Sequence, residues 1–203
     1  MKPEILIHGF ETSNNMKVRV ALGFKEISHE FRTIDPRDRA EVQRLSGQHL
    51  TPVMVHGGRV LFDSAAILRY LEANFPDRPQ LFGSSHREQW AIEDMELFAR
   101  LTLAGPMMEI VHHRVYGGTI DDAMQARCAD AFAGAAATLV DTLEEREWLV
   151  GDAMTAADVT AGPVVYRVLH SKMFALPERS ERVRGWVDRV MAYDRYLDQS
   201  GPS

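Results

Sequence analysis

Strand-forming patterns occur only in the first third of this chain, and this asymmetry limits the folds open to it. Residues 4–10 form a short apolar run containing Gly9, and residues 29–34 alternate between polar and apolar side chains. Residues 51–62 hold two short apolar runs separated by Gly57-Gly58. The first two patterns predict strands and the third predicts a β-hairpin. Because no strand pattern follows Phe62, we expect an α/β domain and then an all-α domain.

Helical patterns fill the gaps between these strands. Residues 16–24 predict a helix between the first two strands, which makes a βαβ unit with a parallel strand pair. Residues 35–46 carry a weaker helical pattern, and residues 65–75 place Ile67, Leu68 and Leu71 on one helical face. The expected first domain is therefore βαβ-α-ββ-α, a thioredoxin-like order of elements.

The remaining chain divides at a segment without periodicity. We expect a first domain over residues 1–77, a linker over 78–85 that contains Pro79 and Gly83, and an all-helical domain over 86–203. Pro106 predicts a kink in the first long helix, because proline breaks the hydrogen bonding of a helix interior. The expected helices of this domain are 86–115, 121–147, 155–171 and 179–193.

Composition excludes several classes of protein. A formal net charge of -6 argues against a general nucleic-acid binder, which would present a basic face. No apolar run approaches the roughly 18 residues of a membrane span, and the N-terminal residues lack the apolar core of a signal peptide. The one cysteine, Cys128, cannot form an internal disulfide. We therefore expect a cytoplasmic protein that binds neither membranes nor nucleic acid.

Three local motifs narrow the fold further. The first runs from Thr51-Pro52 through the hairpin to Asp63-Ser64 and a helix that ends in Tyr70-Leu71. The second is Trp148-Leu149-Val150-Gly151-Asp152, followed by Thr155-x-x-Asp158, which is typical of a helix capping box. The third is the amphipathic segment 186–191 near the end of the chain. In this order and spacing, the set resembles the glutathione transferase family: the glutathione-binding signature, the capping box of the helical domain and the last core helix.

The resemblance implies a thiol site in Thr12-Ser13-Asn14-Asn15, a polar cluster that can also cap the following helix, with Thr12, Ser13 and Asn14 as the candidate catalytic residues. A hydroxyl there would donate a hydrogen bond to the thiolate of glutathione. Counting back five residues from Lys17 gives Thr12, and counting back four gives Ser13, according to which members of the family are compared. Asn14 matches an asparagine that approaches the sulfur in some bacterial members. A helix cap without chemistry is the alternative interpretation of the same cluster.

The rest of the implied glutathione site lies in the hairpin and its flanks. The Thr51-Pro52 bond is cis in the family and exposes the backbone of Thr51 to the cysteinyl part of glutathione. Asp63 and Ser64 would hold the γ-glutamyl ammonium and carboxylate. His49 is the nearby polar candidate for the glycyl end, because Leu50 stands where many members have a polar residue.

The second substrate would be a small hydrophobic electrophile, and candidates for its pocket lie in the helical domain. Met107, Val111 and Tyr116 can form an apolar wall there, although each could equally be core. His112 and His113 are adjacent, and adjacent helical residues point about 100° apart, so they suit a shared metal ion poorly. We expect no metal.

The resemblance implies a homodimeric enzyme that conjugates glutathione to its electrophile. A glutathione-dependent isomerase or dehalogenase is a related possibility, because residues 12–19 are laid out as in isomerase members that carry Ser-Ser-Cys here. A non-catalytic scaffold for a partner protein, such as a bacterial cell-division factor, is the alternative outside catalysis.

Overall fold

The computed structural model describes residues 4–197, and these form two compact units. The first unit consists of residues 4–81 together with 192–197, and the second consists of residues 82–191. The domain order α/β and then all-α agrees with the prediction. Each unit has its own core and is described separately below.

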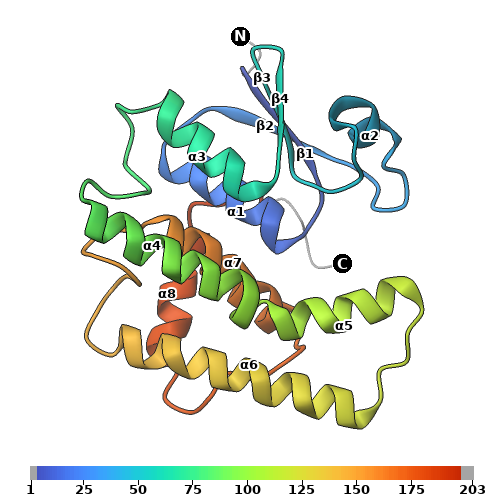
Figure 1. Cartoon of the computed structure of the whole chain (residues 1–203), viewed down its shortest axis with the longest axis vertical. Coiled ribbons are helices and arrows are strands. Elements are labelled where there is room, and N and C mark those ends of the chain that lie inside the picture. The colour runs from blue at the N-terminus through green and yellow to red at the C-terminus, as the bar shows by residue number, and fades with distance from the viewer. Residues whose placement is uncertain (1–3, 198–203) are drawn as a thin grey trace. The chain divides into compact units, whose positions relative to one another are not determined.

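A four-stranded mixed sheet forms the centre of the first unit, with strand order β2-β1-β3-β4 (Figure 1). The edge strand β2 pairs with β1 in parallel, while β1 with β3 and β3 with β4 are antiparallel. The predicted βαβ unit and β-hairpin are therefore both confirmed. The strands are β1 (Ile5–Gly9), β2 (His29–Thr33), β3 (Val53–His56) and β4 (Arg59–Phe62).

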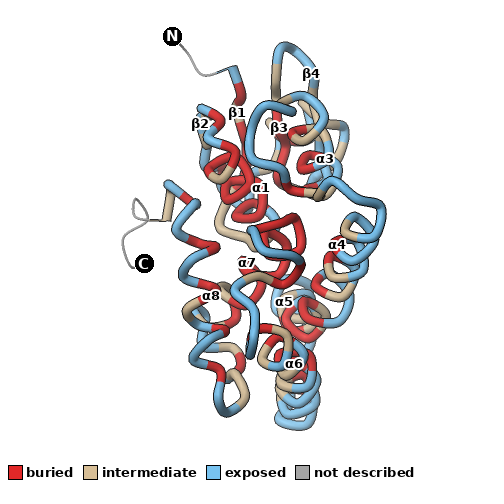
Figure 2. The backbone as a smooth tube through the Cα atoms, turned by 90° about the vertical axis from the view of Figure 1, so that its left-hand side faces the viewer, coloured by how far each residue is buried: buried red, intermediate tan, exposed pale blue. Residues whose placement is uncertain are grey.

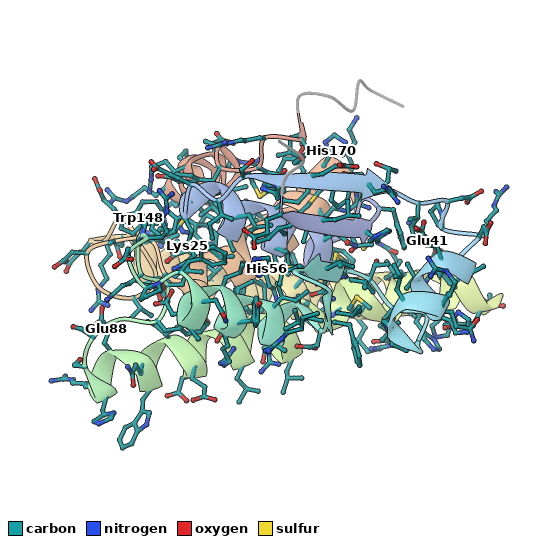
Figure 3. All side chains as sticks on the ribbon, turned by 90° about the horizontal axis from the view of Figure 1, so that it is seen from above. Lys25, Glu41, His56, Glu88, Trp148 and His170 are labelled. Atoms are coloured by element: carbon teal, nitrogen blue, oxygen red, sulfur yellow. The ribbon has the colours of Figure 1, made fainter. Side chains whose placement is uncertain are left out.

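Three helices of the first unit pack with the sheet or with one another. Helices α1 (Ser13–Phe24) and α3 (Ser64–Asn74) contact each other, whereas α2 (Ala40–Ser46) contacts β3 and β4. Val42 of α2 belongs to a small separate core with Ile34 and Val53. His8 lies in the register position opposite Val53 and pairs with Glu41 of α2, which is labelled in Figure 3. Ile5 and Ile7, which precede His8 in β1, are fully buried.

The segment 192–197 packs with the first unit, so the predicted helical domain of 86–203 extends too far. Arg19 of α1, itself 1% exposed, forms an ion pair with the buried Asp194 (Nη2 to Oδ2, 2.8 Å) and with Glu11 (2.7 Å). The Tyr196 hydroxyl accepts from the backbone N–H of Phe31 (3.1 Å) and donates to the carbonyl of His29 (3.0 Å). These long-range partners could not be read from the local pattern.

The second unit, residues 82–191, consists of helices joined by loops and contains no strand. Its helices are α4 (His86–Phe98), the π-helical segment η1 (Ala99–Leu103), α5 (Gly105–Tyr116), α6 (Asp122–Leu143), α7 (Ala156–His170) and α8 (Glu181–Met191). Figure 2 shows α7 as a largely buried helix, and residues 156–165 are all buried. Among residues 4–197, no helix combines the length and apolar character that a membrane crossing needs.

The prediction of one kinked helix over residues 86–115 is only partly correct. The irregularity begins at Ala99, before the proline, and Pro106 lies in the first turn of a new helix. The reason is that proline lacks an N–H, which a helix leaves unpaired in its first turn anyway. The chain therefore breaks ahead of Pro106 and restarts on it.

A single carboxylate joins the second and third sequence motifs. Asp158 is fully buried and accepts from the backbone N–H groups of Leu149 (2.9 Å) and Thr155 (2.9 Å) and from the Trp186 indole (2.8 Å). The predicted capping box at Thr155 is thus confirmed, and the same residue also fixes the preceding loop and the last helix. Burial raises the pKa of Asp158 despite these donors.

Candidate functional site

The N-terminus of α1 is capped by Thr12. Its backbone is extended (φ -133°, ψ 157°), and its hydroxyl oxygen accepts from the backbone N–H of Asn15 (3.3 Å). Ser13 is the first helical residue. All residues of α1 lie within the described range 4–197, and its first turn contains no acidic side chain. Its positive end is therefore not neutralised by the helix itself and favours an anion nearby.

Asn15 is the residue of the predicted thiol-site cluster to which the sequence analysis gave no role. It is fully buried, and its Nδ2 donates both to Thr12 Oγ1 (2.7 Å) and to Thr51 Oγ1 (2.8 Å). The one signal in the sequence is position: three residues after the cap is where a capping-box side chain reaches back toward the cap. Its link to Thr51, 36 residues away, has no local signal.

The Thr51-Pro52 peptide bond is cis, as the resemblance implies. Pro52 is buried and leads directly into β3, whereas Thr51 is half-buried. The Thr51 hydroxyl faces the N-terminus of α1 through its hydrogen bond from Asn15. The binding-loop candidate and the thiol-site candidate are therefore in one hydrogen-bonded cluster.

Asp63 and Ser64 lie where β4 passes into α3. Asp63 caps α3, because its Oδ1 accepts from the backbone N–H groups of Ala65 and Ala66 (3.0 Å each). Its φ of 68° is rare for a residue with a side chain and costs about 1–3 kcal/mol. Ser64 is 6% exposed and donates from its hydroxyl to Asn14 Oδ1 (3.2 Å). Strained backbone beside a helix N-terminus is typical of ligand-binding positions.

The structure thus brings most of the predicted glutathione-site residues together within the first unit. Thr12 and Thr51 meet through Asn15, and Asn14 meets Ser64 directly. Three segments far apart in the sequence contribute to this cluster: the N-terminus of α1, the cis-proline loop and the N-terminus of α3. We call it the α1–α3 cluster, consisting of Thr12, Asn14, Asn15, Thr51 and Ser64.

Within residues 4–197, no hydrogen bond or ion pair joins His49 to this cluster. It is exposed, and its carbonyl accepts from the guanidinium of Arg39 (3.1 Å), which also stacks on the Phe10 ring at 5.0 Å. Leu50 is 73% exposed. The Gln48 amide bonds to the backbone N–H and carbonyl of Leu50, so it serves to shape its own loop.

The three candidates for the second-substrate pocket differ in exposure. Met107 is buried (6% exposed), Val111 is half-buried, and Tyr116 is 75% exposed against the His112 ring at 4.5 Å. Core packing is the better description of Met107. The pocket assignment for the other two stays a prediction.

Other polar groups lie apart from the cluster. His56, labelled in Figure 3, bonds through Nδ1 to the Tyr70 hydroxyl (2.9 Å) and pairs through Nε2 with Glu4 (3.3 Å). Cys128 is buried, and burial raises the pKa of its thiol, which suits a packing role. Within residues 4–197, no group of three or more His, Cys, Asp or Glu side chains is arranged to hold a metal ion.

Two family models match the chain on either side of the domain boundary. Residues 7–79 match the glutathione S-transferase N-terminal domain, and residues 121–189 match the glutathione S-transferase C-terminal domain. The chain belongs to the glutathione S-transferase family. The first match includes all five residues of the α1–α3 cluster. The second includes Asp158 and the residues that it joins.

Curated relatives resemble the chain over part of their length. A glutathione S-transferase of Triticum aestivum is 33% identical over 75 residues, which are 37% of this chain and 35% of that relative. A maleylacetoacetate isomerase of Dictyostelium discoideum is 27% identical over 99 residues, which are 46% of this chain and 45% of the relative. The chain matches about a third of the length of the first of these relatives.

Solved structures resemble the chain over nearly its whole length. A delta-class glutathione transferase of Nilaparvata lugens has a TM-score of 0.80 at 18% identity and covers 96% of this chain and 92% of its own. A glutathione S-transferase domain-containing protein of Marinobacter aquaeolei has a TM-score of 0.77 at 25% identity and covers 92% and 97%. At 18% identity, the likeness to the Nilaparvata lugens structure concerns the fold alone.

Proposed function

We propose that this protein binds glutathione in the first unit and conjugates it to a small hydrophobic electrophile. The observation that carries the proposal is the α1–α3 cluster, which joins a helix-capping hydroxyl, a cis-proline loop and the N-terminus of a second helix. These are the groups needed for the thiol, the peptide backbone and the γ-glutamyl end of one tripeptide.

The energy needed to ionise the thiol is within reach of this arrangement. A cysteine-like thiol has a pKa of about 8.5, and lowering it by two units takes about 2.7 kcal/mol. A hydrogen bond to an anion contributes roughly 1.5–3 kcal/mol, and a helix N-terminus contributes about 0.3–1 kcal/mol. Thr12 and the positive end of α1 together suffice, so no general base is needed. Ser13, half-buried at the first helical position, is the other donor to be tested.

Each remaining part of glutathione has a candidate partner. The backbone of Thr51 would pair with the cysteinyl backbone as an added strand does. The N-terminus of α3 at Ser64 would hold the γ-glutamyl carboxylate. Asp63 uses Oδ1 for capping, so its other oxygen would take the ammonium group. The thiolate then attacks an electrophilic carbon, a C–S bond forms, and the leaving group departs with the electron pair of the broken bond.

A glutathione-dependent isomerase is the second candidate, and the similarity to a maleylacetoacetate isomerase favours it. In that reaction the thiolate would add to a carbon–carbon double bond, the resulting single bond would rotate, and the thiolate would leave again. Glutathione would therefore be required without being consumed. Following free thiol during turnover distinguishes the two reactions.

Thermal unfolding with and without millimolar glutathione tests binding. Ligand at 100 times its dissociation constant adds about 2.7 kcal/mol to the free energy of unfolding, a shift of roughly 5–11 °C at this chain length. Absence of a shift would support the non-catalytic scaffold instead. Thiolate absorbance of bound glutathione should then fall in Thr12→Ala or Ser13→Ala, with the exposed Thr119→Ala as matched control. If both Thr12→Ala and Ser13→Ala keep the thiolate absorbance of the wild type, the assignment of the thiol site is wrong.

We also propose that the chain forms a homodimer, as expected for the family. Trp90 (71% exposed), Leu97 (47%) and Leu101 (68%) are spaced by seven and four residues and form an apolar stripe along α4 and η1. Sedimentation of the wild type should give the dimer mass, and Trp90→Glu should shift it toward the monomer. Gln89→Glu, an exposed change of the same sign on the same helix, is the control. A wild type that sediments as a monomer at all concentrations refutes this proposal.

A cytoplasmic location remains part of the proposal. Its support is the buried, unpaired Cys128, because reducing compartments keep such thiols free. Fractionation of the source cells tests it directly.

A further inference from the structure

Asn15 is a buried polar side chain whose hydrogen bonding is incomplete. The residue is 0% exposed, and both hydrogen bonds of its side chain are donated by Nδ2, to Thr12 Oγ1 and to Thr51 Oγ1. Its Oδ1 has no hydrogen-bond partner among residues 4–197. An unpaired buried carbonyl oxygen is unfavourable, so an apolar side chain would serve packing better. The amide therefore calls for a reason beyond packing, and its two donated bonds supply one.

The strand before α1 makes room for this amide. A β-carbon placed on Gly9, the last residue of β1, would lie 1.8 Å from Asn15 Oδ1. Any side chain at Gly9 would displace Asn15 from its position. The close approach of the strand to the helix N-terminus thus depends on a glycine facing an asparagine.

The consequence for Thr12 follows from the valence of a hydroxyl group. A hydroxyl oxygen has two lone pairs and one proton. Both lone pairs of Thr12 Oγ1 are engaged by donors from the same residue, the backbone N–H of Asn15 (3.3 Å) and its Nδ2 (2.7 Å). Within the described part of the chain, Thr12 Oγ1 only accepts hydrogen bonds. Its proton is therefore the one remaining bonding group, and it can only be donated.

We propose that Asn15 is a positioning residue that holds the Thr12 hydroxyl as a hydrogen-bond donor toward the sulfur of bound glutathione. This inference rests on the proposed function and names the residue that orients its thiol site. A free threonine hydroxyl rotates between donor and acceptor roles, whereas this one is fixed by two N–H groups. Asn15 does not touch the sulfur itself.

The same amide couples the thiol site to the peptide-binding loop. Because Nδ2 also donates to Thr51 Oγ1 (2.8 Å), one planar group sets the distance between Thr12 and the cis-proline loop. In the proposed complex, that loop holds the cysteinyl backbone and Thr12 faces the cysteinyl sulfur. Asn15 would therefore fix both ends of the same cysteine residue.

The test is the pKa of the bound thiol, measured by thiolate absorbance across pH at saturating glutathione. Asn15→Leu keeps the size of the side chain but removes both donated bonds, so we expect the thiol pKa to rise by about one to two pH units. Asn15→Asp should raise it as well, because a carboxylate accepts only and would take the Thr12 proton for itself. The matched control is Val20→Ala, a buried change in the same helix that lowers thermal stability but leaves the thiol pKa unchanged.

The outcomes separate this inference from the function on which it rests. A wild type whose bound thiol keeps an ordinary pKa overturns both. If the wild type lowers the thiol pKa and both Asn15→Leu and Asn15→Asp lower it equally, only the role of Asn15 is overturned. If Asn15→Leu does not fold, Asn15→Asp decides. If neither folds, slow exchange of both Asn15 side-chain amide protons in the wild type, seen by NMR, supports the two donated bonds, and fast exchange refutes them.

Discussion

Removing one hydrogen bond from Asp158 should destabilise the helical unit measurably. In Asp158→Asn, the amide oxygen can still accept from Leu149 and Trp186, which both bond to Oδ1. The amide nitrogen would replace Oδ2, which accepts from the backbone N–H (2.9 Å) and from the hydroxyl (3.1 Å) of Thr155. The hydroxyl can turn and accept from the new amide N–H, but the backbone N–H of Thr155 would lose its acceptor. Leaving one buried donor unpaired costs about 1–3 kcal/mol, which lowers the melting temperature by roughly 2–12 °C at this chain length.

The control and the readout both follow from the structure. Asp152→Asn makes the same exchange at an exposed position in the neighbouring loop, where surface changes stay within about 0.5 kcal/mol. The three tryptophans, Trp90, Trp148 and Trp186, all lie in the second unit, so fluorescence during urea unfolding reports that unit. If Asp158→Asn loses no more stability than Asp152→Asn, the four-bonded carboxylate is not the anchor described above.

Three further results are expected. Gly9→Ala should weaken glutathione binding and lower the melting temperature, because its methyl group would displace Asn15; unchanged binding measured by calorimetry would contradict this. Arg19→Met should cost about 3–5 kcal/mol in urea unfolding, since it leaves the buried Asp194 unpaired, and adding Asp194→Leu should recover part of that loss. Burial lowers the pKa of His8 in the folded protein, so the unfolded chain takes up a proton first and the free energy of unfolding falls as the pH drops below about 6.5. His8→Gln should make that fall less steep in unfolding curves recorded at several pH values. An equally steep fall in the variant would refute this role of His8.

Local patterns were sufficient for the order of elements in the first unit. The strands have period-two or continuous apolar patterns, and Gly57-Gly58 marks the hairpin, so both were predicted. The capping box at Thr155 was also predicted, since its two members are three residues apart. Features of this kind depend on neighbours in the sequence, which is why the sequence alone reveals them.

Features that depend on distant partners were missed. Asn15 reads as one more polar residue in a capping cluster until its bond to Thr51 is seen. The site of the break before Pro106 depends on how the preceding turn widens into a π-helix, which has no sequence signature here. The packing of Asp194 against Arg19 joins residues 175 positions apart, beyond any local pattern.

That last pairing bears on how the protein is made. The first unit takes strands and helices from residues 4–81, yet the buried one of the two carboxylates that pair with Arg19 lies 175 positions further along the chain. After Leu81 the ribosome must add more than a hundred further residues before Asp194 exists, and until then Glu11 is the one carboxylate of this pair that the Arg19 guanidinium can meet. The first unit begins first and is completed last, so a fragment ending at Leu81 should be expressed as an incomplete fold rather than an independent domain.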